Sequence, residues 1–124
     1  MAINWKSFCG DVSLKVEGDT IEVPLEGARH QRINVHISDD VIYLHSLVAH
    51  PAPTSRFENA SLRAWERNRA VSIVAFRIDE RGRMVGEAWM PTAGLTQGEF
   101  LIYIRTVAIE CDRFEYQITG DDVH

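Results

Sequence analysis

The chain has 124 residues, a mass of 14.1 kDa and a formal net charge of -5, with 13 Lys and Arg against 18 Asp and Glu. Its 45% hydrophobic and 25% charged residues are ordinary globular usage, so a single domain over residues 1–124 is expected and wholesale disorder is not. The acidic balance weighs against a general binder of nucleic acid or of an anionic membrane, because such binders need a positive surface.

The N-terminal half predicts a short helix followed by three strands. Apolar residues spaced by three and four between Ile3 and Leu14 indicate an amphipathic helix. The run Asp19–Leu25 alternates apolar and polar residues, as in a strand with one wet face, and Pro24 places it at an edge or an end of the sheet. The stretch Gln31–Ala49 predicts two strands joined at Ser38-Asp39-Asp40, with the second strand central because it is apolar at nearly every position.

After a loop that contains Pro51 and Pro53, the chain predicts a second helix over Phe57–Asn68. This helix places Leu62 and Trp65 on one side and charged residues on the other.

A hairpin follows the second helix. Its strands are expected over Val71–Asp79 and Arg83–Met90, with Gly82 in the left-handed region of the turn between them. This register predicts Phe76 opposite Gly86 on the core face, and Ile73 opposite Trp89 on the other face.

The last element is predicted to be a long helix. Thr96 and Glu99 match a capping box, and Gly120 supplies a stop after about Thr119. Its buried stripe steps by three and four through Phe100, Ile104, Val107, Cys111, Phe114 and Ile118. The element order is therefore α-β-β-β-α-β-β-α, an α+β fold with an antiparallel sheet.

Two features of the sequence indicate a cytoplasmic protein. Cys9 and Cys111 are far apart and have no metal-type spacing, as expected of reduced thiols. The N-terminus lacks the apolar run of a signal peptide, and no segment is apolar enough to span a bilayer.

Few residues suggest chemistry. If residues 39–40 form a two-residue turn, His36 lies opposite Tyr43 and His45 opposite Asn34, which puts His30, His36 and His45 on one sheet face. There they either bind Zn or Ni or are hydrogen-bonded surface imidazoles. Cys9 is either a nucleophile or a buried small hydrophobe, and Cys111 lies on the core stripe.

The second helix is also rich in arginine. The cluster Arg56, Arg63, Arg67 and Arg69 fits phosphate contacts, an acidic partner segment or simply a solvated helix face.

A surplus of apolar residues points to binding. Ile102, Ile109 and Tyr116 are seven residues apart and lie opposite the buried stripe of the last helix, while Ile73 and Trp89 lie on the outer side of the last hairpin. A helix and a sheet that are each apolar on both sides need a second cover. That cover is either another helix of the same chain or a subunit or peptide interface, for which these residue types are typical.

The chain from Leu62 to Tyr116 resembles the type III secretion chaperone-like superfamily, most closely its YbjN-type branch, which has the Tir-chaperone-like fold. The resemblance rests on Leu62–Asn68, Val74–Val85, Glu87–Pro91 and Gly94-Leu95-Thr96. It implies a small acidic cytoplasmic protein, usually dimeric, that binds other polypeptides and has no chemistry of its own.

The sequence thus predicts a non-enzymatic protein- or peptide-binding module that acts as a homodimer, with no cofactor, nucleic acid or membrane as partner. Its partner would be a secreted or regulatory polypeptide, docked on apolar patches and paired with an edge strand such as Asp19–Leu25. The expected interface residues are Ile73, Trp89, Ile102, Ile109 and Tyr116. Two alternatives remain open: a YbjN-like regulator of a signalling or transcription protein, and a small metal or thiol enzyme using the three histidines or Cys9.

Overall fold

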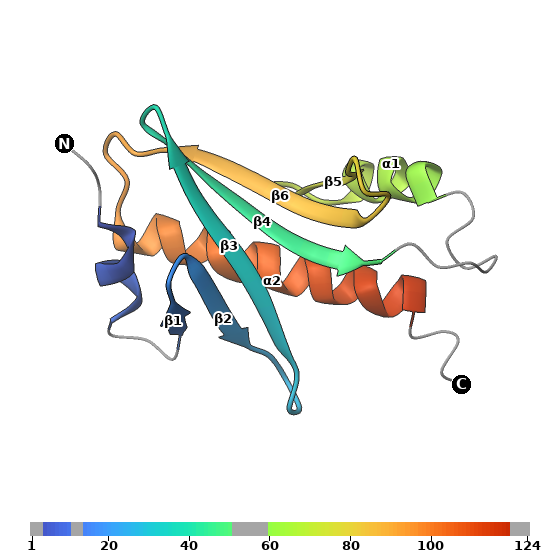
Figure 1. Cartoon of the computed structure of the whole chain (residues 1–124), viewed down its shortest axis with the longest axis horizontal. Coiled ribbons are helices and arrows are strands. Elements are labelled where there is room, and N and C mark those ends of the chain that lie inside the picture. The colour runs from blue at the N-terminus through green and yellow to red at the C-terminus, as the bar shows by residue number, and fades with distance from the viewer. Residues whose placement is uncertain (1–3, 11–13, 51–59, 120–124) are drawn as a thin grey trace.

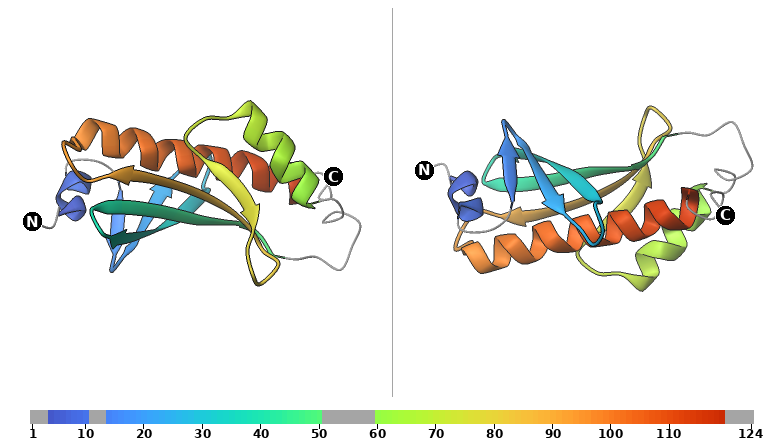
Figure 2. Two further views of the ribbon diagram at one scale, coloured as in Figure 1. Left: turned by 90° about the horizontal axis from the view of Figure 1, so that it is seen from above. Right: turned by 90° about the horizontal axis from the view of Figure 1, so that it is seen from below.

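An antiparallel sheet of six strands carries two helices on one of its faces (Figure 1, Figure 2). The computed structural model describes residues 4–10, 14–50 and 60–119. Its elements are a 3₁₀ helix η1 (Trp5–Cys9), β1 (Lys15–Glu17), β2 (Thr20–Pro24), β3 (His30–Ser38), β4 (Val41–Ala49), α1 (Ala60–Ala70), β5 (Ala75–Ile78), β6 (Met84–Pro91) and α2 (Gln97–Thr119). The strand order is β1-β2-β3-β4-β6-β5. The predicted α+β fold and element order are confirmed, with one strand, β1, added.

The hairpin of β3 and β4 has the predicted two-residue turn. Asp39 and Asp40 both have positive φ angles, 50° and 64°, which is the conformation whose twist matches that of two antiparallel strands. The resulting register pairs His36 with Tyr43 and Asn34 with His45, as predicted. β4 lies between β3 and β6, so its central position is confirmed.

The N-terminal region differs from the prediction. The expected helix over Ile3–Leu14 is a single short η1, and residues 11–13 lie outside the described part of the chain. β1 follows it and pairs with β2 through a turn at Gly18-Asp19, in which Gly18 has φ 61°. This short hairpin was missed, although a Gly-Asp dipeptide between two polar-apolar-polar triplets is a recognised hairpin signal.

The hairpin of β5 and β6 keeps the predicted register at its turn end, with Phe76 opposite Gly86 and Ile78 opposite Met84. Its turn is held by Asp79, whose carboxylate accepts hydrogen bonds from the backbone N–H groups of Arg81 and Arg83, both at 2.9 Å. The side chain of Arg83 donates a further bond at 2.8 Å. The buried Asp79 therefore fixes the turn by satisfying donors on both sides of it.

The helix α2 lies along the sheet and buries its predicted stripe. All six stripe residues, Phe100, Ile104, Val107, Cys111, Phe114 and Ile118, are at most 3% exposed. The capping box is confirmed, since the N–H of Glu99 bonds to the Thr96 hydroxyl and the N–H of Thr96 bonds to the Glu99 carboxylate, each at 3.2 Å. Within the described residues, no helix is long and apolar enough to cross a membrane.

α2 approaches the sheet closely at Gly86. A side-chain carbon built on Gly86 would overlap the sulfur of Cys111 and would lie 3.0 Å from the ring of Phe76. The ring of Phe76 in turn meets that of Phe114 edge-on, with centroids 4.8 Å apart. Only glycine therefore permits this packing, which is the physical reason for the predicted pairing of a large residue with a small one.

The helix α1 packs beside α2 and β5, and not through the side that carries Leu62 and Trp65. It turns Ala64 and Arg67 inward, where Arg67 forms an ion pair with Glu110 of α2 at 2.8 Å. Leu62 and Trp65 are left exposed. The start predicted at Phe57 lies outside the described residues.

We predict that Gly86→Ala destabilises the protein. The added methyl group must displace Cys111 or Phe76, and overpacking of a core costs about 1–3 kcal/mol. Urea unfolding followed by circular dichroism should show this loss, and Cys111→Ala in the same chain should recover part of it. Gly98→Ala is the matched control, because its new carbon has open space in α2 and alanine favours helix by about 1 kcal/mol. An unchanged urea midpoint for Gly86→Ala would show that α2 is not tightly packed against the sheet at this position.

A second prediction concerns acid. Desolvation opposes ionisation of Asp79, but the hydrogen bonds from Arg83 and Arg81 prevail and lower its pKa to about 2. The folded protein therefore binds this proton less readily than the unfolded chain, whose Asp has a pKa near 3.9. The stability that Asp79 contributes is present above about pH 4 and is lost as the pH falls toward 2.

The measurement is the free energy of unfolding of the native chain and of Asp79→Asn between neutral pH and pH 2. The difference between them should shrink as the pH falls through this window. Glu80→Gln, an exposed carboxylate removed from the same turn, is the control. A difference that does not vary with pH would show that the Asp79 charge plays no part in stability.

Candidate protein-binding surfaces

The five predicted interface residues are all exposed in the structure. They are Ile73, Trp89, Ile102, Ile109 and Tyr116, with exposed fractions from 40% for Ile73 to 65% for Trp89. No described segment of the chain covers them, so the alternative that a second helix of the same chain buries them does not hold among the described residues. Their role in an interface remains a prediction.

Sequence reasoning missed four further large apolar side chains at the surface. They are Ile37, Tyr43, Leu62 and Trp65. The sheet register offered a signal for Tyr43, because it places this residue on the same face as His36 and His45. The outward turn of Leu62 and Trp65 had no such signal, since an apolar pair on one side of a helix usually marks its buried side.

One candidate surface lies on the face of the sheet that carries no helix (Figure 2). His36, Tyr43 and Trp89 occupy directly opposed positions on β3, β4 and β6, and we call these three side chains the aromatic row. The rings of His36 and Tyr43 are 6.2 Å apart. Trp89 thus pairs with Tyr43, and the predicted pairing with Ile73 is wrong, because β5 begins only at Ala75.

The pairing fails because the chain turns sharply at Ile73. The N–H of Val74 bonds to the carbonyl of Ser72 at 2.8 Å, and Ile73 between them has φ 75°. These values define the rare γ-turn, and a β-branched residue with positive φ is strained. The structure therefore holds an exposed isoleucine in a costly conformation, which is a feature often found at functional sites.

The second candidate surface lies on the helical layer. On α2, Ile102, Ile109 and Tyr116 point away from the sheet because the opposite stripe is buried against it. On α1, Leu62 and Trp65 are about half exposed, and the guanidinium of Arg69 lies 4.9 Å from the Trp65 ring.

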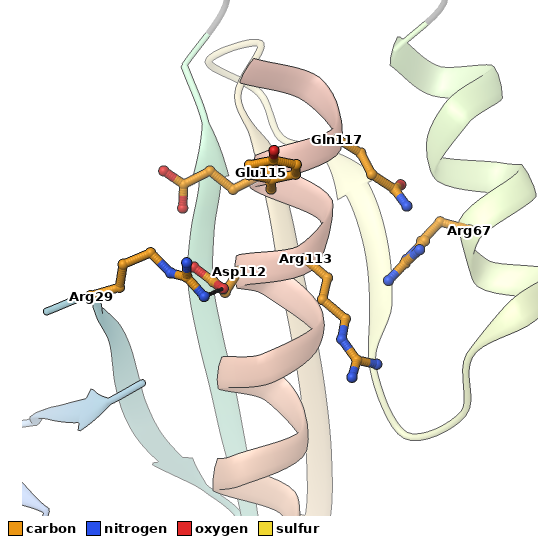
Figure 3. A pocket seen from close by; sticks show the side chains of 7 residues that line it. Arg29, Arg67, Asp112, Arg113, Glu115 and Gln117 are labelled. Carbon is orange, nitrogen blue, oxygen red and sulfur yellow. Dashed lines mark ion pairs between the residues drawn. The ribbon is translucent and has the colours of Figure 1, made fainter. Parts of the chain in front are cut away.

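Shallow hollows run along α2 where it meets the loop after β2. Two of them, of about 270 and 400 Å³, share Pro24, Leu25 and Ile109 in their walls. A larger open hollow of about 790 Å³ surrounds the C-terminal part of α2 and is lined by Arg29, Arg67, Asp112, Arg113, Glu115, Tyr116 and Gln117 (Figure 3).

The charges of the larger hollow are largely paired. Arg29 reaches α2 from the chain between β2 and β3 and forms an ion pair with Asp112 at 3.1 Å, as the dashed line in Figure 3 marks. Desolvation first, and then the charge of Asp112, raises the pKa of Glu115. The lining contains no Cys, Ser or His, so any acid–base chemistry there would fall to its carboxylates and Tyr116.

The two thiols lie in environments that keep them protonated. Burial raises the pKa of Cys9, and burial raises the pKa of Cys111 to about 12. A catalytic thiol needs a lowered pKa, because the thiolate is the nucleophile. Both cysteines are buried, and Cys111 packs against Gly86, so both behave as core residues.

The three histidines share one sheet face, as the register predicted, but they do not converge. His30 lies 3.6 Å from Glu22, His36 stacks beside Tyr43, and His45 pairs across the strands with Asn34. Among the described residues, no group of three or more His, Cys, Asp or Glu side chains could hold a metal ion.

The arginines of α1 are engaged within the molecule. Arg63 donates to the carbonyl of Gln117, Arg67 is paired with Glu110, and Arg69 stacks on Trp65. Arg56 lies outside the described residues. The three described arginines therefore join α1 to α2 or cover its tryptophan.

The sheet edges differ from those expected. β2 was proposed as the edge for a partner strand over Asp19–Leu25, but β1 pairs with it from Thr20 to Glu22. At the other edge, the amide of Asn68 accepts from the N–H of Phe76 at 2.7 Å and donates to its carbonyl at 2.9 Å, so it takes the place of a further strand. Partner pairing along β2 is thus blocked over these three residues.

Neither a protein-family model nor a curated protein sequence matches the chain. Solved structures match it in fold. YbjN from E. coli superposes with a TM-score of 0.62 at 14% identity, over 96% of this chain and 89% of its own. A chain of the heterodimeric ExoU–SpcU complex, from the type III secretion system of Pseudomonas aeruginosa, superposes with a TM-score of 0.64 at 10% identity, over 92% of this chain and 97% of its own. A chain of the ExsC–ExsE complex superposes with a TM-score of 0.54 at 16% identity, over 88% of this chain and 86% of its own.

These likenesses establish the class of fold, an α+β sheet with its helices on one face. More particularly, the chain has the type III secretion chaperone-like fold, which YbjN shares. The resemblance inferred from Leu62 to Tyr116 is therefore confirmed at the level of fold, and it extends over nearly the whole chain.

The strain at Ile73 yields a third prediction. Ile73→Gly and Ile73→Ala both lose the partly buried isoleucine side chain, but only glycine is free of the left-handed penalty of about 1–2 kcal/mol. Glycine adds an entropic cost of about 0.5–1 kcal/mol. Ile73→Gly should therefore be at least as stable as Ile73→Ala in urea unfolding. At the exposed neighbour Ser72, whose φ is in the ordinary range, Ser72→Gly should be about 0.5–1 kcal/mol less stable than Ser72→Ala. If glycine is as unfavourable relative to alanine at position 73 as at position 72, the γ-turn carries no strain.

Proposed function

We propose that this protein is a non-enzymatic, cytoplasmic polypeptide-binding module that acts as a homodimer. The observation that carries the proposal is the set of large apolar side chains exposed on both layers of one small acidic domain. Monomers rarely expose contiguous apolar patches, and patches rimmed by polar groups mark protein-binding sites. Trp, Tyr and Ile are residue types that such interfaces favour or tolerate at their centres.

The two layers place these side chains on opposite sides of the molecule. The outer stripe of α2 points away from the sheet, whereas the aromatic row lies on the sheet face that the helices leave free. One flat interface cannot cover both sides. We therefore assign two separate contacts to this protein, one with a second copy and one with another polypeptide.

The helical layer is our choice for contact with a second copy. α1 and α2 each expose apolar residues there, and the ion pair of Arg67 with Glu110 fixes the two helices to each other. A rigid surface made of two joined helices loses little entropy when it meets its own copy, which favours a two-fold interface. Ile73 and Trp89 are then left for the partner.

The fold supports a binding role. ExoU–SpcU and ExsC–ExsE are complexes of two polypeptides, and this chain shares their fold. YbjN, with the same fold, is described as a candidate transcription regulator, so a regulator that binds a signalling or transcription protein is the second function to consider. The identity of a co-purified partner separates the two: a secreted protein supports the first and a regulatory protein the second.

The environment of the thiols supports a role without catalysis. Burial raises the pKa of Cys9 and of Cys111, which keeps both in the unreactive thiol form. Free cysteines are also typical of a reducing compartment, which fits the cytoplasm.

We predict that the native chain sediments as a dimer of twice 14.1 kDa and that Ile109→Asp shifts it toward the monomer. A carboxylate at the centre of an apolar contact must be desolvated without a partner, which costs several kcal/mol and raises the dissociation constant at least about 100-fold. Sedimentation equilibrium over a range of concentrations measures the dissociation constants of the native chain and of the variant.

Ser38→Asp is the matched control for this experiment. It adds the same charge at an exposed polar position of β3, on the sheet rather than on the helical layer, where a surface substitution has little effect on stability. Circular dichroism should show that both variants stay folded. A native chain that remains a monomer at all concentrations, or an Ile109→Asp variant with unchanged mass, would refute the dimer as proposed.

A further inference from the structure

The aromatic row is open to solvent on a sheet face that no described segment covers. Tyr43 is 44% exposed and Trp89 is 65% exposed. Neighbouring strands are about 4.8 Å apart, so the three side chains of the row stand next to one another across β3, β4 and β6. Half-buried rings that expose their faces attract cations, because the face of an aromatic ring is negative.

An acidic turn lies to one side of this row, at the end of the β3–β4 hairpin. Asp39 follows His36 by three residues, which places the turn roughly 10 Å further along the strand. The carbonyl of Asp40 accepts two bonds from Thr92, from its N–H at 2.9 Å and from its hydroxyl at 3.2 Å. These bonds tie the turn to the end of β6, the strand that carries Trp89. Among the described residues, neither carboxylate bonds to another side chain.

The same sheet face carries a paired arginine beside the row and an exposed arginine at its far end. Arg77 on β5 is paired with Glu87, which lies two residues before Trp89 on β6 and on the same face. Arg32 lies on the same face as His36, four residues before it on β3 and roughly 13 Å away along the strand. The two free carboxylates of the turn thus leave this end of the face negative, in a chain whose net charge is -5.

We propose that the aromatic row and the Asp39–Asp40 turn bind an arginine-containing segment of another polypeptide. One guanidinium stacks on the rings of Tyr43 and Trp89, and a second forms ion pairs with the two carboxylates. Arginine suits both places because its planar, weakly hydrated cation stacks on rings and pairs with carboxylates. This inference rests on the proposed function, since it names the chemistry of the partner.

A second copy of the chain does not fit this surface. In a two-fold contact centred on the row and its turn the same patch meets itself, so the acidic turn of each copy would lie against the same negative surface. The like charges of two Asp39–Asp40 turns would instead repel. The charge of the surface therefore favours a basic partner.

The test is an NMR titration of the full chain with a short Gly–Ser peptide that carries two arginines four positions apart, which lie on the same side of an extended chain and roughly 13 Å from each other. Matched peptides carry citrulline, which has the same shape without the charge, or leucine. We expect the arginine peptide to shift the indole N–H of Trp89 and the amide of Tyr43, and the citrulline peptide to bind several-fold more weakly. High salt should weaken the binding of the arginine peptide but not that of the other two peptides.

Variants locate the site. Trp89→Ala should raise the dissociation constant of the arginine peptide about 3- to 10-fold, the range of a partly desolvated cation–π contact. The double variant Asp39→Asn with Asp40→Asn should raise it about 2- to 5-fold, as expected for ion pairs at a protein surface. Asn also accepts the positive φ of these positions, so the fold is kept. Trp65→Ala, which removes the exposed tryptophan of α1, is the control and should change nothing.

The outcomes separate this inference from the proposed function. If the leucine or citrulline peptide binds the row as tightly as the arginine peptide, a basic partner is refuted while polypeptide binding stands. If the arginine peptide does not bind but the chain is a dimer, the inference fails alone. If the Asp39–Asp40 double variant binds as well as the native chain, the acidic turn is not part of the site. If no peptide binds and the chain is a monomer, both proposals fail.

Discussion

The architecture depends on how closely α2 approaches the sheet at Gly86. Because Gly86 has no side chain, the sulfur of Cys111 and the ring of Phe76 fill the space over β6, and Phe114 closes the gap from α2. This contact fixes the rotation of α2 about its own axis. Once the stripe of Cys111 and Phe114 faces the sheet, the stripe that contains Ile109 must face solvent. The exposed apolar face of the helical layer is thus a consequence of the core.

The described residues form two layers. α2 and α1 cover one face of the sheet, and the described chain provides nothing for the other (Figure 2). On much of that free face, polar side chains pair across the strands and can remain in contact with water, as Arg77 does with Glu87 and Thr20 with Asn34. The aromatic row interrupts these pairs. It is the part of the face that stability alone does not account for, since polar residues at Tyr43 and Trp89 would serve solvation better.

Local sequence signals predicted the elements whose geometry is set by a few neighbouring residues. The turn at Asp39-Asp40, the capping box of Thr96 and the pairing of Phe76 with Gly86 depend on backbone angles and residue sizes that can be read directly. The buried stripe of α2 could also be predicted, because a period of 3.6 over 23 residues leaves little ambiguity.

The errors arose where tertiary packing overrode a local pattern. Leu62 and Trp65 form the more apolar side of α1, yet α1 buries Ala64 and Arg67, because the ion pair with Glu110 and the close approach to β5 decide its rotation. The alternation from Val71 to Asp79 suggested a longer strand, but the γ-turn at Ile73 ends it. For the candidate site, the sequence could indicate that Trp89 is unpartnered. It could not indicate that Tyr43 would be its neighbour, because that contact joins β4 to β6 across a long stretch of chain.

The edges of the sheet bear on how a partner is recognised. Strand addition requires an edge with free backbone groups, and proteins commonly block such edges with short strands and charged residues. β1 is three residues long and carries Lys15 paired with Glu17, while the β5 edge is occupied by the amide of Asn68. Both edges are therefore poor templates for a further strand over these residues. Over these residues, the partner that we propose is therefore held by side chains on the faces of the two layers. This is the reason to look for specificity in the chemistry of the exposed rings and carboxylates rather than in backbone pairing.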